Sequence, residues 1–194
     1  MTHSPVSVGI LLFDDVEELD AVGPWEVLSW WASRSSLSPT VRTFSRDGLG
    51  VRCAKGLRIL PDCSEDELGP LHVLVHPGGL GARRLAKEPE HLAWVRSRRA
   101  SVPLMTSVCT GALVYAAAGL LTARPATTHR GAFDELSRLD PTVLVDTEAR
   151  FVDDGDVITS AGVSAGIDMA LQIVARLESP AAADHVRAGI QYEP

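Results

Sequence analysis

The amino-acid sequence predicts an α/β protein in which a mostly parallel sheet lies between two layers of helices. Short, almost continuously apolar runs such as residues 6–13 and 73–76 are typical of parallel strands that are buried on both faces. These runs alternate along the chain with segments in which apolar residues recur at helical spacing. Because this alternation favours a parallel sheet covered by helices on both sides, the expected fold is a flavodoxin-like three-layer α/β/α sandwich.

The expected strands are short apolar segments bounded by turn residues. They cover residues 6–13, 38–46, 51–60, 73–76, 102–107, 143–145, 149–152 and 157–160. The first helix is expected to begin near Pro24, because proline suits a first helical turn. Its apolar residues at helical spacing are Trp25, Val27, Leu28 and Trp31. The other expected helices cover residues 80–87, 89–99, 110–120, 131–139, 164–177 and 180–189.

Length and composition indicate a single domain over residues 1–194. A chain of 194 residues with 45% hydrophobic and 22% charged residues is globular in composition, and no linker, repeat or low-complexity segment divides it. No apolar run reaches the roughly 18 to 20 residues of a membrane span. Residues 1–5 lack the basic start of a signal peptide, and the run 6–13 is too short for one. We therefore expect no membrane partner.

Charge and cysteine usage argue against further classes. The formal net charge of −7 argues against a nucleic-acid partner, which would need clustered Lys and Arg. The short basic run at residues 96–99 is expected to be the solvated end of a helix. Three irregularly spaced cysteines indicate reduced thiols in a cytoplasmic protein rather than a disulfide framework. Neither Cys-x-x-Cys nor His-Glu-x-x-His occurs, so no metal site is expected.

Cys109 stands where a buried strand is expected to turn sharply into a helix. In residues 107–111, Ser-Val-Cys-Thr-Gly, a nucleophile-type residue lies between small residues, as in a nucleophile elbow that lifts a side chain above a sheet. The positive end of the following helix favours the thiolate, so the pKa of the Cys109 thiol is expected to be lowered. The alternative is a cysteine that packs as a small apolar residue, and this role is expected for Cys53 and Cys63.

Two further strand ends are expected to lie near Cys109, because ligands of open α/β sheets bind outside the carboxyl ends of the strands. At Pro77-Gly78-Gly79, two glycines allow a tight turn, and the amides of Gly79 and Thr110 are expected to form an oxyanion hole. A plain strand-to-helix turn is the alternative for this segment.

Asp20 lies among apolar residues, so its carboxyl is expected to point inward while Glu17 and Glu18 face water. Beside a thiolate, desolvation and like charge raise the pKa of such a carboxyl, which could then serve as a general acid. The alternative is that all three carboxylates form a solvated approach to the first helix. His129 is a further candidate base in the pocket, with a structural role as its alternative.

These segments together resemble the ThiJ/PfpI superfamily, the single-domain relatives of class I glutamine amidotransferases, and within it the isonitrile hydratases. The resemblance runs from Val6 to about Leu177 and is carried by five ordered segments, residues 19–28, 77–79, 106–113, 118–129 and 158–168. Thr110 follows the cysteine, as in the hydratase group, whereas the protease-like members have histidine there. Ala21-Val22 departs from the hydratase pattern, in which Leu-Thr is common.

The resemblance implies a homodimer without cofactor that hydrates an isonitrile to an N-substituted formamide. Cys109 would be the nucleophile that forms a thioimidate, and Asp20 would be the general acid and base. Gly79 and Thr110 would position the reacting groups, while Val163 and Gly78 would line the pocket. Two other classes stay open: a non-catalytic redox or ligand sensor, and a glyoxalase or deglycase-type enzyme for small dicarbonyls, which would need His129 close to the sulfur.

Overall fold

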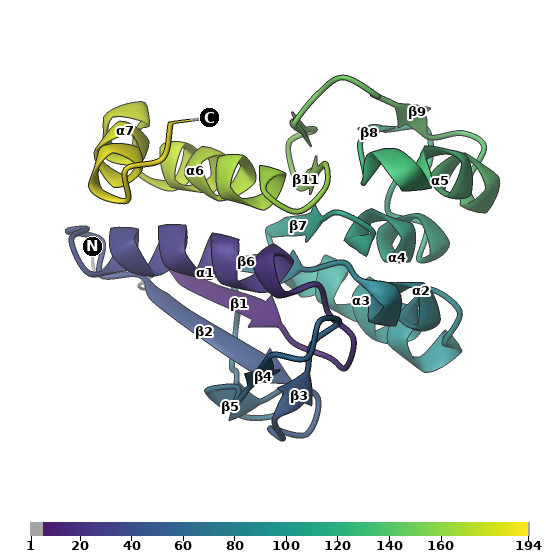
Figure 1. Cartoon of the computed structure of the whole chain (residues 1–194), viewed down its shortest axis with the longest axis horizontal. Coiled ribbons are helices and arrows are strands. Elements are labelled where there is room, and N and C mark those ends of the chain that lie inside the picture. Colours follow the sequence, from purple (N-terminus) through teal and green to yellow (C-terminus); the bar gives the residue numbers. More distant parts are fainter. Residues whose placement is uncertain (1–5, 194) are drawn as a thin grey trace.

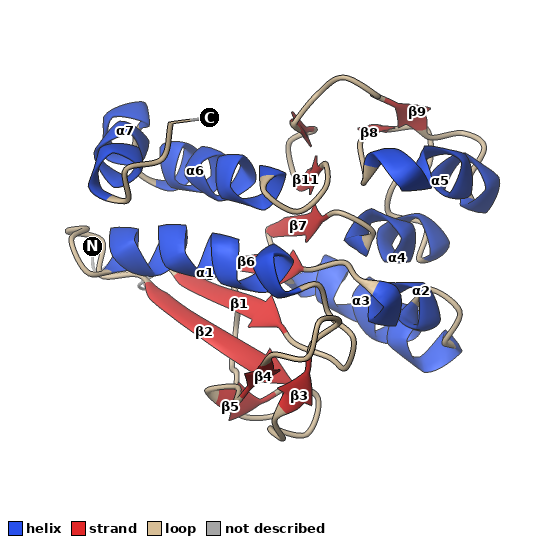
Figure 2. Ribbon diagram, viewed as in Figure 1, coloured by secondary structure: helices blue, strands red, loops and turns tan. Residues whose placement is uncertain are grey.

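Seven strands form one central sheet in the computed structural model, which describes residues 6–193 (Figures 1 and 2). The spatial order is β10-β11-β7-β6-β1-β2-β5, and every neighbouring pair is parallel except β10 with β11. The strands of this sheet are β1 (Ser7–Leu11), β2 (Thr40–Ser45), β5 (Cys63–Ser64), β6 (Val73–His76), β7 (Leu104–Val108), β10 (Phe151–Asp153) and β11 (Val157–Ser160). The mostly parallel sheet that the sequence predicts is confirmed.

Helices cover both faces of the sheet (Figure 2). On one face lie α1 (Glu18–Ala32), α6 (Ala165–Leu177) and α7 (Pro180–Gly189). On the other face lie α2 (Leu80–Leu85), α3 (Pro89–Ser101), α4 (Gly111–Ala117), the short 3₁₀ helix η1 (Arg130–Ala132) and α5 (Phe133–Leu139). The three-layer sandwich is thereby confirmed.

The central strands are buried on both faces because each one contributes to two cores. Along β6, Val73 and Val75 pack toward α1 and α6, while Leu74 packs toward the layer of α3 and α4. Side chains of successive strand residues point to opposite faces, so a strand buried on both sides favours apolar residues on each face. This is the physical reason for the short apolar runs in the sequence.

Three details differ from the predicted elements. The first helix begins at Glu18 and contains Pro24 in its interior, so the expected start near Pro24 is wrong. The expected strand over residues 51–60 is instead an antiparallel hairpin of two short strands, β3 (Val51–Arg52) and β4 (Arg58–Ile59), since Gly56 with φ 100° turns the chain back. The expected strand at residues 143–145 is present as β9 (Leu144–Val145), whereas its parallel partner β8 (Pro125–Ala126) and the edge strand β5 were missed.

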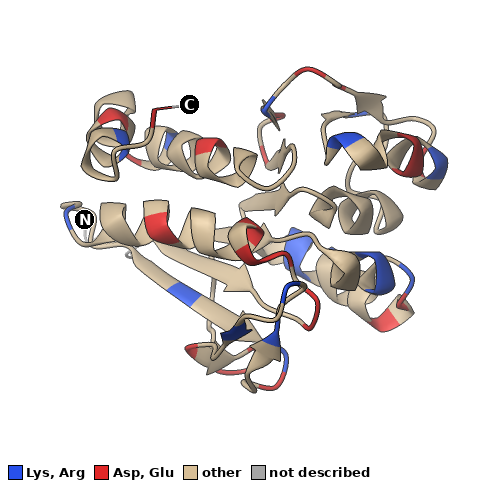
Figure 3. Ribbon diagram, in the orientation of Figure 1, with Lys and Arg blue, Asp and Glu red and all other residues tan. Residues whose placement is uncertain are grey.

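Acidic and basic residues are interspersed on both helical layers in the view of Figure 3. No helix within residues 6–193 combines the length and the apolar character that a bilayer crossing requires. The expectation that the chain starts without a signal peptide concerns residues 1–5, which lie outside the described residues.

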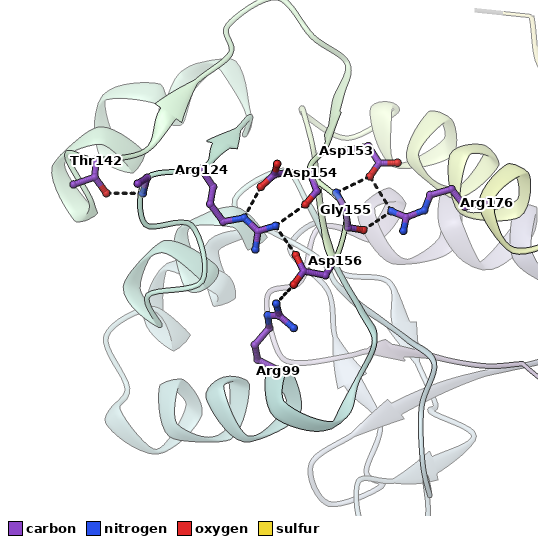
Figure 4. A network of polar contacts seen from close by, with 9 residues as sticks. Arg99, Arg124, Thr142, Asp153, Asp154, Gly155, Asp156 and Arg176 are labelled. Atoms are coloured by element: carbon purple, nitrogen blue, oxygen red, sulfur yellow. Dashed lines mark hydrogen bonds and ion pairs between the residues drawn. The ribbon is translucent and has the colours of Figure 1, made fainter.

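Three arginines contact the turn between β10 and β11 (Figure 4). The turn is followed by β11 and then by the loop after this strand. Arg124 contacts Asp154 and Asp156, and Arg99 contacts Asp156 from α3. Arg176 of α6 lies 2.8 Å from Asp153. The network joins both helical layers to this turn, so it couples distant parts of the chain.

We expect Arg124→Met to lower the free energy of unfolding by about 1 to 2 kcal/mol, because the variant leaves two half-buried carboxylates with fewer partners. Urea unfolding followed by circular dichroism measures this. Arg187→Met is the matched control, since Arg187 contacts Asp184 in an exposed pair within one helix, and its effect should stay within roughly 0.5 kcal/mol. Equal effects of the two substitutions would contradict a stabilising network.

Candidate active site

Cys109 occupies a tight turn between β7 and α4 with a φ of 56°, a left-handed conformation that is unfavourable for a side chain other than glycine. Its N–H is shared between the carbonyl oxygens of Ser160 and Ala161, at 3.1 and 3.2 Å. Two positions later, a Cβ on Gly111 would lie 2.3 Å from the backbone oxygen of His76, so only glycine fits. The strand-turn-helix geometry that the sequence predicts is present.

The sulfur of Cys109 lies in a nearly closed environment, and the residue is only 6% exposed. The pKa of the Cys109 thiol is raised to about 12, first by burial and then by the charge of Asp20. The backbone N–H groups of Thr110 and Val163 face the sulfur and lower its pKa. The expectation of a lowered pKa is therefore wrong, because the cost of desolvating a thiolate exceeds what two amides and the short helix α4 return.

Asp20 lies in the first turn of α1 and is completely buried, which agrees with the predicted inward direction of its carboxyl. Its Oδ2 accepts a hydrogen bond from the N–H of Gly78 at 3.0 Å, while Oδ1 is buried without a hydrogen-bond partner among the described residues. The pKa of Asp20 is raised to about 7. Burial is the largest cause and the charge of Glu17 also raises this pKa, while the Gly78 amide, Cys109 and Lys55 oppose the rise. Asp20 and Cys109 thus form a buried acid–thiol pair in which the carboxyl titrates near neutral pH while the thiol keeps its proton.

Gly78 and Gly79 bring the strand end of β6 against this pair. The N–H of Gly79 donates to Oγ1 of Thr110 at 2.9 Å, and that hydroxyl donates to the Gly79 carbonyl at 3.2 Å. The Gly79 amide is therefore already used, which removes one half of the expected oxyanion hole. The amides that face the sulfur are those of Thr110 and Val163, so Val163 offers a backbone donor in addition to an apolar side chain.

We expect Gly78→Ala to lower the free energy of unfolding by about 1 to 3 kcal/mol, because a Cβ there would lie 2.5 Å from the Thr110 nitrogen and 2.9 Å from Asp20 Oδ2. Thermal and urea unfolding measure the loss. Gly50→Ala is the control, since its Cβ would be in ordinary contact at 3.4 Å from the Ile59 oxygen. If Gly78→Ala were as stable as Gly50→Ala, the described packing around Asp20 would be wrong.

His129 lies beside the site but forms no hydrogen bond with Cys109 in the part of the chain that the structure describes. Its Nδ1 accepts the N–H of Gly131 at 3.0 Å, and a Cβ on Gly162 would lie 2.3 Å from its ring. The preceding residue, Thr128, donates from Oγ1 to the Cys109 carbonyl at 2.7 Å. These contacts fit the structural role of His129, which supports the loop that carries Val163.

Glu17 and Glu18 do not face water as expected. Lys55, at the tip of the β3–β4 hairpin, contacts both carboxylates and donates its backbone N–H to Glu18 Oε1 at 2.6 Å. The two glutamate side chains are therefore mostly covered, at 19% and 17% exposure. Sequence reasoning missed Lys55 because the contact joins residues 37 and 38 positions apart; it also treated His76 only as a strand residue.

Fold and site define a flavodoxin-like α/β protein with a buried cysteine–carboxyl pair near the ends of β6 and β7. The chain belongs to the DJ-1/PfpI family, whose model matches residues 6–176. It is 35% identical over 189 residues to isonitrile hydratase of Pseudomonas putida, covering 97% of this chain and 79% of that protein. A ThiJ/PfpI family crystal structure from Pseudomonas syringae superimposes with a TM-score of 0.87 at 31% identity, covering 98% and 76% of the two chains. A glutathione-independent glyoxalase of Caenorhabditis elegans is 29% identical and covers 86% of each chain.

Proposed function

We propose that this protein hydrates isonitriles to N-substituted formamides, with Cys109 as nucleophile and Asp20 as proton carrier. The observation that carries the proposal is the buried pair itself: a protonated thiol faces a carboxyl whose pKa is raised to about 7. Such a pair can add S–H across an unsaturated carbon, because one group gives up the proton that the other delivers. The similarity to an isonitrile hydratase at 35% identity supports this choice of substrate.

In the first half-reaction, the Asp20 carboxylate accepts the thiol proton as the sulfur of Cys109 attacks the terminal carbon of the isonitrile. Asp20 then transfers that proton to the same carbon, and the product is a thioimidate, R–N=CH–S–Cys109. One S–C bond and one C–H bond form while the S–H bond breaks. Because the proton is supplied by the thiol, this step needs no lowered thiol pKa.

In the second half-reaction, Asp20 accepts a proton from water as the water oxygen attacks the thioimidate carbon, and the nitrogen receives this proton. The resulting tetrahedral intermediate releases the formamide when its C–S bond breaks and the hydroxyl proton passes through Asp20 to the sulfur. The amides of Thr110 and Val163 face the sulfur and stabilise its negative charge as it leaves. The sum is isonitrile plus water to formamide.

The test is a substrate panel with the purified full-length chain, in which an alkyl isonitrile is compared with methylglyoxal and with a primary amide. Formamide formation, followed by NMR, supports the proposal. Turnover of methylglyoxal alone would overturn it in favour of the glyoxalase class, to which a relative at 29% identity belongs. No turnover, together with reversible oxidation of Cys109 to sulfenate by mild peroxide, would overturn it in favour of a sensor.

We further propose that the chain acts in the cytoplasm as a single-domain homodimer. All three cysteines are free thiols, which fits a reducing compartment. For the dimer, the support is a set of exposed apolar residues on α1 and directly after β4: Leu19, Val22, Trp25 and Leu60, at 37, 38, 40 and 78% exposure. Clustered exposed apolar residues are typical of protein interfaces.

We expect Trp25→Glu to raise the dimer dissociation constant roughly 30-fold or more, because a tryptophan at the centre of an interface often contributes 2 kcal/mol or more. Sedimentation velocity over a concentration series measures this shift. Leu139→Glu is the control, since Leu139 is similarly exposed, at 41%, but ends α5 on the other face of the sheet. A monomeric wild-type chain would contradict the proposed dimer.

A further inference from the structure

Two histidines lie close to the peptide group of Gly78, the glycine that donates a hydrogen bond to Asp20. His76, the last residue of β6, is completely buried, and its Nδ1 lies 2.8 Å from the carbonyl oxygen of Pro77. Its Nε2 lies 3.0 Å from Nε2 of His91, on α3. The proposed reaction uses neither ring, although a buried imidazole pair is costly unless both rings are well bonded.

The two hydrogen bonds determine which nitrogen carries each proton. The Pro77 carbonyl oxygen only accepts, so Nδ1 of His76 must be the donor. Burial lowers the pKa of His76 to about 3 and that of His91 to about 4, so both rings are neutral at pH 7. A neutral His76 that donates from Nδ1 has an accepting Nε2, and His91 must therefore donate from its own Nε2.

With the protons assigned in this way, the hydrogen bonds form a continuous series that ends at the carboxyl of Asp20. The Pro77 carbonyl and the Gly78 N–H belong to the same peptide group, and that N–H donates to Asp20 Oδ2 at 3.0 Å. His91 donates to His76, His76 donates to this peptide group, and the peptide group donates to Asp20. A carbonyl that accepts a hydrogen bond makes its own peptide N–H a stronger donor, so successive bonds reinforce one another.

We propose that His76 and His91 are positioning residues, which fix the orientation of the Pro77–Gly78 peptide group and strengthen the hydrogen bond from Gly78 to Asp20. The inference rests on the Cys109–Asp20 pair of the proposed function but not on the identity of the substrate. It assigns a role to one buried ring, His76, and one half-buried ring, His91, neither of which touches the sulfur or the carboxyl.

The surroundings of both imidazole rings keep the rings neutral and so preserve the direction of these hydrogen bonds. His76 contacts the rings of Phe13 and Tyr115 at 5.6 and 5.8 Å, and burial raises the pKa of Tyr115, which keeps its proton. His91 stacks on Trp94 at 5.2 Å and faces the charge of Arg46, which disfavours an imidazolium.

The titratable groups that act on Asp20 come from three parts of the chain. They are Glu17, directly before α1, and Lys55 on the hairpin, while the Cys109 thiol on the elbow acts through a hydrogen bond. Substitutions at His76 or His91 leave all three in place, so a change in the pKa of Asp20 would report the amide of Gly78 itself.

The experiment measures how fast iodoacetamide alkylates Cys109 as a function of pH in the full-length chain, with the labelled peptide quantified by mass spectrometry. Alkylation needs the Asp20 carboxylate as base, so its rate is expected to rise with a midpoint near the pKa of Asp20. His76→Leu removes both hydrogen bonds and should raise this midpoint by about 0.5 to 1 pH unit. His76→Asn keeps an N–H near the position of Nδ1 and should recover at least half of the shift.

Two further variants keep the test decisive. His91→Phe preserves an aromatic ring against Trp94 but removes the N–H that donates to His76. It should therefore raise the midpoint of alkylation by a smaller amount than His76→Leu. If His76→Leu does not fold, His91→Phe tests the same series of hydrogen bonds. His185→Phe is the matched control. His185 lies on α7 and packs edge-on against Trp30 of α1, so this substitution should leave the midpoint unchanged.

An unchanged midpoint in a folded His76→Leu, or in His91→Phe where His76→Leu does not fold, would overturn the inference. So would a shift that His76→Asn does not reduce. Because alkylation requires no isonitrile, failure of the proposed hydration with these shifts intact would refute only the proposed function.

Discussion

Replacing Cys109 by alanine is expected to lower the rate of isonitrile hydration on the order of 10⁴-fold or more, because no other group of the site can form the bond to carbon. Alanine should be tolerated at the turn, since the elbow is held mainly by backbone contacts: the Cys109 N–H to the oxygens of Ser160 and Ala161, and its carbonyl to Thr128. The measurement is formamide production at saturating isonitrile, together with a melting curve that verifies folding.

Cys63→Ala is the control for Cys109→Ala. Cys63 is a half-buried thiol on the edge strand β5, and burial raises its pKa as well, so it tests whether a buried cysteine alone accounts for activity. We expect Cys63→Ala to retain wild-type turnover. Residual hydration in Cys109→Ala within tenfold of the wild type would refute a covalent intermediate on this sulfur.

Asp20→Asn is expected to lower hydration by roughly 10²- to 10⁴-fold, because an amide can neither accept the thiol proton nor return it to carbon. In the wild type the rate should rise as the pH increases through about 7, where the Asp20 carboxylate forms. The variant should lose this dependence. A pH–rate profile of kcat/KM for both proteins measures the difference, and an unchanged profile in Asp20→Asn would exclude Asp20 as the titrating base.

The same substitution is expected to increase stability at high pH. The pKa of Asp20 is raised from 3.8 to about 7 in the folded chain, so between these values the unfolded chain is ionised while the folded chain keeps its proton. The free energy of unfolding therefore falls as the pH rises from about 4 to 7, by about 4 kcal/mol at 1.4 kcal/mol per pH unit. Asp20→Asn removes this loss, so its stability relative to wild type should increase from pH 5 to pH 8.

Urea unfolding at pH 5 and pH 8 measures this relative stability. Glu26→Gln is the control, because Glu26 is exposed on the same helix and should show no comparable change between the two pH values. A constant difference between Asp20→Asn and wild type at both pH values would show that the carboxyl is not buried as described. Gain of stability with loss of activity is typical of a functional group held in an unfavourable environment.

Local patterns predict the sheet and the elbow well. The run Val73–His76 lies in a strand with the predicted bounds, because a strand buried on both faces leaves a continuous apolar signature. The position of Cys109 followed from the small residues around it, and its φ of 56° agrees with that inference. Both signals lie within a few consecutive residues, so no long-range information was needed.

Long-range contacts account for the parts that sequence reasoning missed. The pKa of Cys109 depends on how α1 and the loop after β11 close over the sulfur, which local geometry at the elbow does not reveal. The Gly79 amide is occupied by the Thr110 hydroxyl from another strand end, 31 residues away. The start of α1 was misplaced because proline is also tolerated inside a helix when tertiary packing compensates, and Pro24 is buried there.

Pro24 has no N–H to donate to the main-chain oxygen of Asp20, four residues earlier, so one rung of the helical ladder is missing next to the residue that carries the reacting carboxyl. The turn before the proline is therefore joined to the remainder of α1 by one hydrogen bond fewer, while the buried side chains of Val27, Leu28 and Trp31 anchor the helix beyond it in the core.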